Sequence, residues 1–159
     1  MKPISSLFLL LMSLMLILAG CEEETYEFGE PFSKITGITG SFVLTKVVQV
    51  DERTTALDNT FDISEFFIGS EPAKLSFNGS DFSYSLQSGT APNFLGDTLG
   101  SWKFDDNDFP TEISLGTSNP TVLKLNRTIR EIDQTLEFSV TRSCSGTAGV
   151  SYQYVFTRE

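Results

Sequence analysis

The feature that most constrains this fold is an alternation of apolar and polar side chains, which recurs along the chain from Gly40 onward. Successive residues of a strand point to opposite faces, so a period of two predicts strands that bury one face. In 81–87, for example, Phe82, Tyr84 and Leu86 alternate with polar residues. The pattern occurs in eight segments, which are 40–50, 73–78, 81–87, 99–105, 111–116, 121–127, 133–142 and 150–158.

Most connections between these segments are short and rich in turn residues, such as Asn78-Gly79 and Ser118-Asn119-Pro120. Strands joined by short connections usually pair as antiparallel neighbours, and one polar face per strand leaves one face of the sheet in water. The chain is therefore predicted to be all-β, an eight-stranded antiparallel up-and-down barrel whose closure removes exposed edges. A two-sheet sandwich is the alternative.

The first predicted strand, 40–50, is the least regular of the eight. Phe42, Leu44, Val48 and Val50 fall on one face of a strand with a period of two, and Lys46 is the exception on that face. We therefore expect these four apolar side chains to share the inner face of the strand.

The connection 51–72 is much longer than the others, and a long connection in a compact domain usually carries structure or covers a site. Asp62 to Phe67 predicts a short helix, with Asp62 as its cap and Glu65 as the partner three residues later. Its aromatic residues are expected to cover one barrel end as a lid, and these are Phe61, Phe66 and Phe67. Two interpretations stay open: the segment plugs the barrel, or it guards the mouth of a ligand site.

Residues 1–20 have the composition of a secretory signal. Lys2 supplies a basic start, Leu7 to Leu18 is almost entirely apolar, and Ala19-Gly20-Cys21 follows. The apolar run is shorter than the stretch of about 20 residues that a membrane-spanning helix needs. We expect 1–20 to be a cleaved signal, 21–35 an acidic tether, and 36–159 the barrel domain.

The ending Leu18-Ala19-Gly20-Cys21 resembles the lipobox of bacterial lipoproteins. This resemblance implies that Cys21 is lipidated and that its acyl chains make the membrane a partner of the protein. Several acyl chains hold a protein to a bilayer durably, whereas one chain holds it only marginally. Glu22-Glu23-Glu24 resembles an export signal of Gram-negative surface lipoproteins, although such a run is also typical of a solvated tether. We expect an outer-membrane protein on the cell surface, with the periplasmic face as the alternative.

Several kinds of chemistry are absent from the sequence. The chain contains no histidine, which excludes a Ser-His-Asp triad, a histidine-ligated metal site and a histidine to activate Cys144. Asp105, Asp106 and Asp108 cluster before Pro110, where turn formation explains them. A formal net charge of −10 argues against nucleic acid as a partner. We predict no cofactor, no metal site and no enzymatic activity.

Four aromatic residues are the candidate ligand contacts, and these are Tyr84, Trp102, Tyr152 and Tyr154. A phenol or an indole combines a large apolar surface with a polar group that needs a partner when it is buried. In an open barrel these side chains would stack on a sugar or enclose an apolar ligand. In a filled barrel they would only pack, and small eight-stranded barrels often fill their interiors with side chains.

Short motifs across 36–159 resemble the lipocalin-like domains of unknown function found on Gram-negative surface lipoproteins. The motifs are Ile38-Thr39-Gly40-Ser41-Phe42-Val43-Leu44, Leu75-Ser76-Phe77-Asn78-Gly79, Gly100-Ser101-Trp102-Lys103-Phe104 and Tyr152-Gln153-Tyr154-Val155-Phe156-Thr157. The resemblance implies a calycin-like barrel and an association with outer-membrane glycan uptake. True lipocalins have tryptophan two residues after the glycine of the first strand, where this chain has Phe42.

These observations leave three hypotheses about function. The first is a non-enzymatic module that binds a small apolar molecule or a glycan near outer-membrane uptake proteins. The second is an accessory protein without a pocket, which docks on a partner through its exterior or through 51–72. The third, a hydrolase with paired carboxylates, has the least support because a turn explains the clustered aspartates. An open cavity with convergent polar groups would favour the binding module. A filled interior with an apolar patch on the exterior would favour the accessory protein.

Overall fold

The computed structural model describes residues 32–54, 58–91, 93–144 and 147–159. These residues belong to one compact unit, Phe32–Glu159. The predicted signal, Cys21 and the tether up to Pro31 lie outside the described residues, as do Ser145, Gly146 and the side chain of Cys144.

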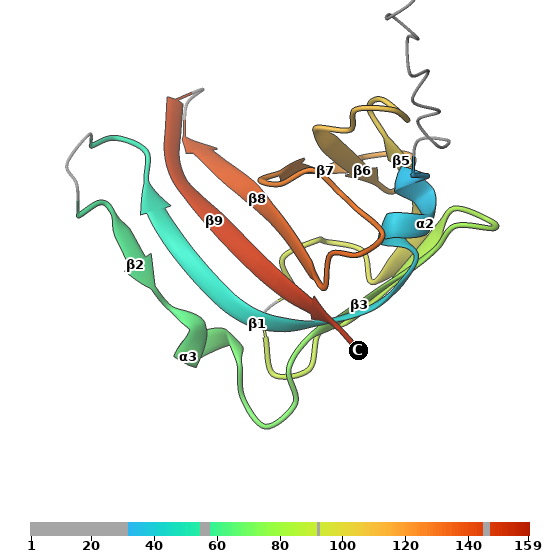
Figure 1. Cartoon of the computed structure of the whole chain (residues 1–159). Coiled ribbons are helices and arrows are strands. Elements are labelled where there is room, and N and C mark those ends of the chain that lie inside the picture. Colours follow the sequence, from blue (N-terminus) through green and yellow to red (C-terminus); the bar gives the residue numbers. More distant parts are fainter. Residues whose placement is uncertain (1–31, 55–57, 92, 145–146) are drawn as a thin grey trace, which may run out of the picture. The chain divides into compact units, whose positions relative to one another are not determined.

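Two short helices and nine strands lie in the described part of the chain (Figure 1). The helices are α2 (Lys34–Ile38) and α3 (Ser64–Phe67). The strands are β1 (Gly40–Asp51), β2 (Thr60–Asp62), β3 (Lys74–Asn78), β4 (Ser83–Gln87), β5 (Leu99–Phe104), β6 (Glu112–Leu115), β7 (Thr121–Leu125), β8 (Thr135–Cys144) and β9 (Thr147–Arg158). Apart from the short β2, each strand coincides with a predicted one.

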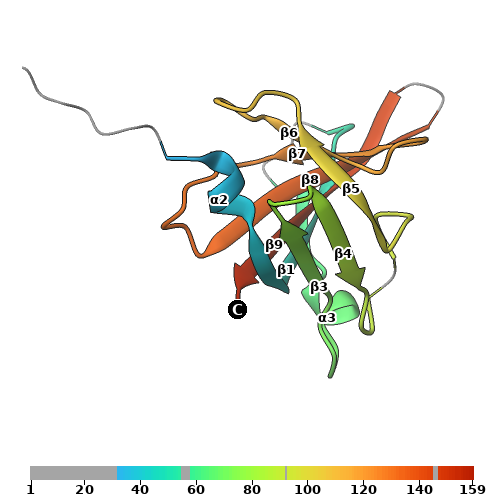
Figure 2. The ribbon, with the colours of Figure 1, turned by 90° about the vertical axis from the view of Figure 1, so that its right-hand side faces the viewer.

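The strands close into an antiparallel barrel. In the order β1, β3, β4, β5, β6, β7, β8 and β9, each strand pairs with the next, and β9 pairs back with β1. Figures 1 and 2 show β1, β9 and β8 side by side in one continuous wall. The predicted eight-stranded up-and-down barrel is confirmed. Strand β2 lies outside this closed order and pairs only with Val48–Val50 of β1, whereas β3 pairs with Gly40–Val43.

The core is formed by the inward faces of the strands. In β3 to β6 the buried positions alternate, and they are Leu75, Phe77, Tyr84, Leu86, Trp102, Phe104, Ile113 and Leu115. Phe138 of β8 and Phe156 of β9 are fully buried, and their rings stack with centroids 5.6 Å apart. At this level the barrel is therefore filled with side chains.

The first strand departs from the prediction at a β-bulge. Between Leu44 and Lys46 the register of β1 against β9 shifts, so one extra residue enters β1. Side-chain alternation moves by one position beyond the bulge, and Val47 becomes the completely buried residue, opposite Tyr154. Val48 and Val50 fall on the other face, so the expectation that they share a face with Phe42 and Leu44 is wrong, although Val50 is still buried.

Helix α2 lies at one end of the barrel (Figure 2), and Arg158 ties the backbone at the end of this helix to β9. The Arg158 guanidinium donates hydrogen bonds to the carbonyls of Thr39 and Gly37 at 2.7 and 2.6 Å, and lies 4.6 Å from the centre of the Phe42 ring. Phe42 thus makes a cation–π contact at the position where lipocalins have tryptophan. Helix α2 was not predicted from the sequence, whereas the strand that follows it begins at Gly40, as predicted.

Helix α3 lies where the long connection predicted a helix, but its start differs. The helix cap is Ile63, and the Asp62 carboxylate instead accepts hydrogen bonds from the Ser64 N–H and hydroxyl at 3.0 and 2.6 Å. The Val47 N–H donates to the Ser64 Oγ at 3.0 Å, which fixes α3 to the bulged region of β1. Within the described residues, neither helix has the length and apolar character to cross a membrane.

Candidate functional site

An open cavity of about 510 Å³ lies at the end of the barrel near α3. Its walls come from the inner faces of β1, β8 and β9, from α3 with the residue before it, and from the connection 88–98. The lining residues are Gln49, Ile63, Phe66, Phe67, Asn93, Phe94, Arg142, Tyr152 and Tyr154. A volume of this size is in the range of about 300–1,000 Å³ that small-molecule sites occupy.

The cavity exists because three strands are longer than the rest. β1 and β9 have 12 residues each and β8 has 10, whereas β3 to β7 have four to six. In an antiparallel pair, residues directly opposite each other share a face. The inner face therefore carries two successive cross-strand rows: Val47, Tyr154 and Phe138, then Gln49, Tyr152 and Val140. Arg142 lies one further step along β8, opposite Val150.

Phe94 forms the floor of the cavity. It lies in the connection between β4 and β5, is 5% exposed, and stacks on Tyr154 with ring centroids 4.3 Å apart. Its ring is also 6.3 Å from that of Phe138 and 6.1 Å from that of Phe156. The connection thus inserts an aromatic side chain into the barrel and separates the filled interior from the open space above it.

The side chain of Asn93 shapes the turn that presents Phe94. Its Oδ1 accepts hydrogen bonds from the N–H groups of Leu95 and Gly96 at 3.1 and 3.2 Å, and its Nδ2 donates to the Gly96 carbonyl at 2.6 Å. Gly96 has a φ of +86°, which an L-residue rarely adopts. Sequence reasoning missed this floor, although an apolar pair, Phe94-Leu95, inside a polar loop was a signal for it.

The predicted lid residues take up different environments. Phe67 is partly buried and packs edge-on against Tyr154 at 6.3 Å. Phe66 lines the rim of the cavity and is 71% exposed. Phe61 lies in β2 and is also exposed, outside the lining. Of the three, Phe67 forms part of the cavity wall and Phe66 forms part of its rim, whereas Phe61 contacts neither the core nor the cavity.

The polar groups of the cavity are gathered on β1, β8 and β9. Within the described residues, the side chains of Gln49, Arg142, Tyr152 and Tyr154 have no hydrogen-bond or ion-pair partner. Burial raises the pKa of Tyr154 to about 12, while the Arg142 guanidinium lowers it and Tyr152 raises it further. The Tyr154 phenol is therefore a neutral donor at physiological pH.

Of the four predicted ligand contacts, only Tyr152 and Tyr154 line the cavity. Trp102 is buried in an aromatic cluster with Phe77, Phe82 and Phe104, and its indole N–H donates to the Asn78 carbonyl at 3.2 Å. Tyr84 is buried as well, and its hydroxyl donates to the Asp97 carbonyl at 3.4 Å. These two side chains are satisfied inside the protein and lie away from the lining.

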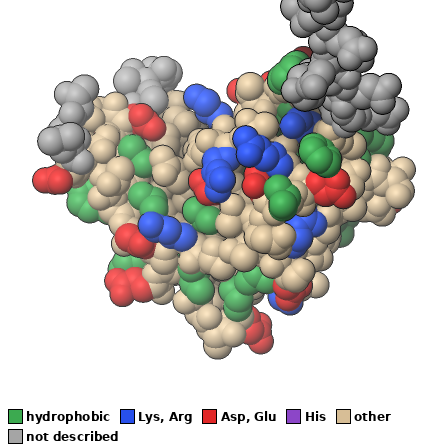
Figure 3. Space-filling view, in the orientation of Figure 1, with side chains coloured by type: hydrophobic (Ala, Val, Ile, Leu, Met, Phe, Trp, Pro, Cys, Tyr) green, Lys and Arg blue, Asp and Glu red, His purple; other side chains and the backbone are tan. Residues whose placement is uncertain are grey.

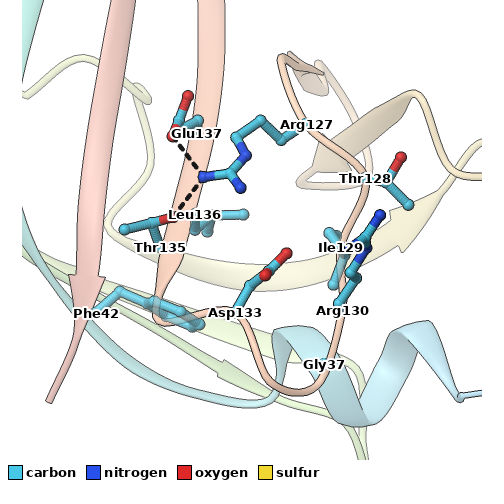
Figure 4. Close-up of a pocket in the computed structure, with 10 residues that line it drawn as sticks. All are labelled: Gly37, Phe42, Arg127, Thr128, Ile129, Arg130, Asp133, Thr135, Leu136 and Glu137. Carbon is cyan, nitrogen blue, oxygen red and sulfur yellow. Dashed lines mark hydrogen bonds and ion pairs between the residues drawn. The ribbon is translucent and has the colours of Figure 1, made fainter.

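A second hollow lies at the closed end and is too small for a ligand (Figure 4). It holds about 10 Å³, which is about the space for one water molecule. Arg127 crosses it and donates from Nη1 to Thr135 Oγ1 and Glu137 Oε1, both at 3.1 Å. The open end with α3 is therefore the candidate site.

Two aspartates of the cluster before Pro110 accept hydrogen bonds from residues of the turn that contains them. Asp105 accepts hydrogen bonds from the Thr111 hydroxyl and from the N–H groups of Thr111 and Glu112, which lower the pKa of Asp105 to about 2. Asp106 accepts from the N–H groups of Asp108 and Phe109. Across the described residues, no three Cys, Asp or Glu side chains come together as a metal site.

Comparison with known proteins places the chain in a family. Residues 20–157 match the family model described as Domain of unknown function (DUF5004). The chain belongs to the DUF5004 family. Neither a comparison with curated proteins nor one with solved structures found a match to this DUF5004 chain. The family match and the closed eight-stranded barrel fit the lipocalin-like fold that the sequence motifs predicted.

Proposed function

We propose that this DUF5004 protein is a non-enzymatic ligand-binding module that lipid on Cys21 anchors to the outer membrane. The observation that carries the binding proposal is the open cavity of about 510 Å³ above the Phe94 floor. The cavity combines an aromatic floor with unpartnered polar groups on Gln49, Tyr152 and Arg142. In small-molecule sites, apolar and aromatic surface contributes affinity and a few polar groups fix the orientation of the ligand. A small apolar molecule or a glycan that stacks on tyrosine fits this chemistry.

Catalysis is left out of the proposal because of the lining chemistry. Among the described residues that line the cavity there is no carboxylate, cysteine, serine or lysine. General acid–base and nucleophilic catalysis most often use such a group within hydrogen-bond reach of the substrate. Burial raises the pKa of the Tyr154 phenol to about 12, far from the neutral range that suits a catalytic acid or base. Asp105 and Asp106, the carboxylates that a hydrolase would need to expose, are occupied by backbone N–H groups of their own turn.

The location follows from the N-terminal motif. Leu18-Ala19-Gly20-Cys21 supports lipidation, and the acidic run that begins at Glu22 supports the cell surface, with the periplasmic face as the alternative. A tethered binding module at the outer membrane fits an association with outer-membrane uptake proteins, to which it would deliver or present its ligand.

Binding is tested by a glycan array and a small-molecule screen with the chain from residue 22 onward, which retains the whole compact unit Phe32–Glu159. Tyr152→Ala is expected to weaken any hit about tenfold, because it removes one aromatic wall. Phe109→Ala is the matched control, since Phe109 is 80% exposed and lies outside the lining. A hit that both variants bind equally would lie outside the cavity and would contradict the proposal, as would the absence of any hit.

Anchoring is tested with Cys21→Ala in the full chain. Because Cys21 is the proposed acylation site, the variant should move from the membrane fraction to the soluble fraction and lose incorporation of a labelled fatty acid. Continued membrane retention without label would contradict the lipid proposal. Protease accessibility in intact cells distinguishes the cell surface from the periplasmic face.

A second candidate, an accessory protein that docks on a partner through 51–72, is favoured by one observation. Phe61 and Phe66 are 53% and 71% exposed and are separated by only four residues. Two exposed aromatics on one segment are typical of a protein contact. Phe61→Ser would then abolish association with an uptake protein in a pull-down and leave glycan binding unchanged, whereas the cavity proposal expects the association to persist.

A further inference from the structure

The cavity carries one sign of charge although the protein carries the other. The chain has 21 acidic and 11 basic side chains, yet of the described residues that line the cavity only Arg142 is charged. Figure 3 shows acidic and basic side chains interspersed on the face that it presents, which is the ordinary pattern of a soluble surface. The cavity differs from that pattern because the part of its lining that the structure describes has a cation and no anion.

The Arg142 guanidinium has no partner within the described residues. By contrast, Arg127 binds Glu137 and Thr135, and Arg158 binds two backbone carbonyls. Arg130 also has no side-chain partner within the described residues, but it lies outside this cavity. In the strand pairing, the acidic residue nearest to Arg142 is Asp51. The two residues are not on adjacent strands, because Asp51 of β1 and Arg142 of β8 both pair with Val150 of β9, which lies between them. Two strand spacings, about 9.6 Å, separate their backbones, and the Asp51 carboxylate accepts from Arg53.

The groups around Arg142 are ordered from apolar to polar along the strands. Phe94 and Phe67 lie at the level of Tyr154, the next row outward carries Tyr152 and Gln49, and Arg142 comes after it. An elongated ligand therefore meets aromatic rings at the bottom, the hydroxyl and amide groups of Tyr152 and Gln49 in the middle, and a guanidinium at the top. A planar guanidinium binds carboxylate, sulfonate or phosphate with paired hydrogen bonds, which a neutral hydroxyl cannot match.

We propose that the cavity selects small amphipathic anions, molecules with an aromatic or apolar body and one anionic group that Arg142 binds. This proposal rests on the proposed function, because it names the class of ligand that the cavity takes. Neutral ligands of the same shape are expected to bind about tenfold more weakly, since a charge-assisted pair at a partly open site contributes about that much.

The test compares two fluorescent probes of nearly the same shape, anilinonaphthalenesulfonate, which is anionic, and N-phenylnaphthylamine, which is neutral. Both are titrated into the folded chain from residue 22 onward. The wild-type protein should bind the anionic probe about tenfold more tightly, and this preference should shrink as salt is added because salt screens the pair. Arg142→Gln should lower the affinity for the anionic probe to that for the neutral probe and so remove the preference, while Arg142→Lys should retain part of it.

Arg130→Gln is the matched control, because Arg130 is an exposed arginine outside this lining. It should leave the affinities of both probes unchanged, and an equal loss in Arg130→Gln and Arg142→Gln would attribute the preference to net charge and overturn the proposal. Equal binding of the two probes to the wild-type protein would also overturn it while leaving the binding function intact. Binding of neither probe would instead count against the proposed function itself.

Discussion

Replacement of Phe94 by alanine tests how the floor of the cavity is built. Phe94 is 5% exposed, stacks on Tyr154 at 4.3 Å, and has two further rings 6.1 and 6.3 Å away. A Phe→Ala change in a core costs about 3–5 kcal/mol, which includes the loss of ring–ring contacts. One side of this ring borders the open cavity, where water can enter the vacated space. We therefore expect a loss near the lower limit, about 3 kcal/mol.

The loss is measured by urea denaturation monitored through the emission of Trp102, the single tryptophan, which is buried away from the cavity. For a domain of about 130 residues, 3 kcal/mol corresponds to a decrease in Tm of about 11 °C. Phe109→Ala, a change at an exposed phenylalanine, should alter the free energy of unfolding by less than about 0.5 kcal/mol. If Phe94→Ala lost no more than this control, the connection 88–98 would not be packed into the barrel and the described floor would be refuted.

Three further changes test the turn, the buried phenol and the closed end. The Asp105 pKa of about 2 lies below the ordinary 3.8, so the ionised carboxylate stabilises the fold and Asp105→Asn should lower stability at neutral pH. The difference in stability between the variant and the wild-type protein should vanish during acid titration from about pH 4 to 2, and a difference that stayed constant would contradict this reasoning. The Tyr154 pKa of about 12 lies above the ordinary 10.0, so stability should fall as pH rises from about 10 to 12, and Tyr154→Phe should show a shallower fall in alkaline denaturation. Arg158→Ala should cost about 3 kcal/mol in thermal unfolding, because it removes two charge-assisted hydrogen bonds and a cation–π contact. A loss of stability equal to that of the exposed control Arg130→Ala would show that these contacts are not stabilising.

Most of the fold was predictable because alternation is a local property. The residue two positions away shares a face, so each of the segments 73–78, 81–87 and 99–105 shows its buried face without any knowledge of its partners. Short connections then determine which strands are neighbours, and eight such strands can close on themselves. Helix α2 was missed because five residues are too few to display a helical period.

The candidate site was only partly predictable because it depends on register. Tyr152 and Tyr154 were identified as amphipathic aromatics of the last strand, and both line the cavity. Gln49 and Arg142 join them only through the pairing of β9 with β1 on one side and β8 on the other. Those two residues have no distinctive sequence context, so their convergence required the strand partners to be known.

The bulge in β1 shows how one residue decides which side chain reaches the core, and it can be tested by a matched pair of valines. Val47 is completely buried opposite Tyr154, whereas its neighbour Val48 is partly exposed on the other face. Val47→Ala removes two methyl-sized groups from the core and should cost about 2 kcal/mol, with Val48→Ala costing less than about 1 kcal/mol. Both changes lower strand propensity equally, so the difference in urea denaturation reports burial alone. A larger loss for Val48→Ala would mean that the strand keeps a strict period of two through Lys46, and the inner wall of the cavity would then lose Gln49.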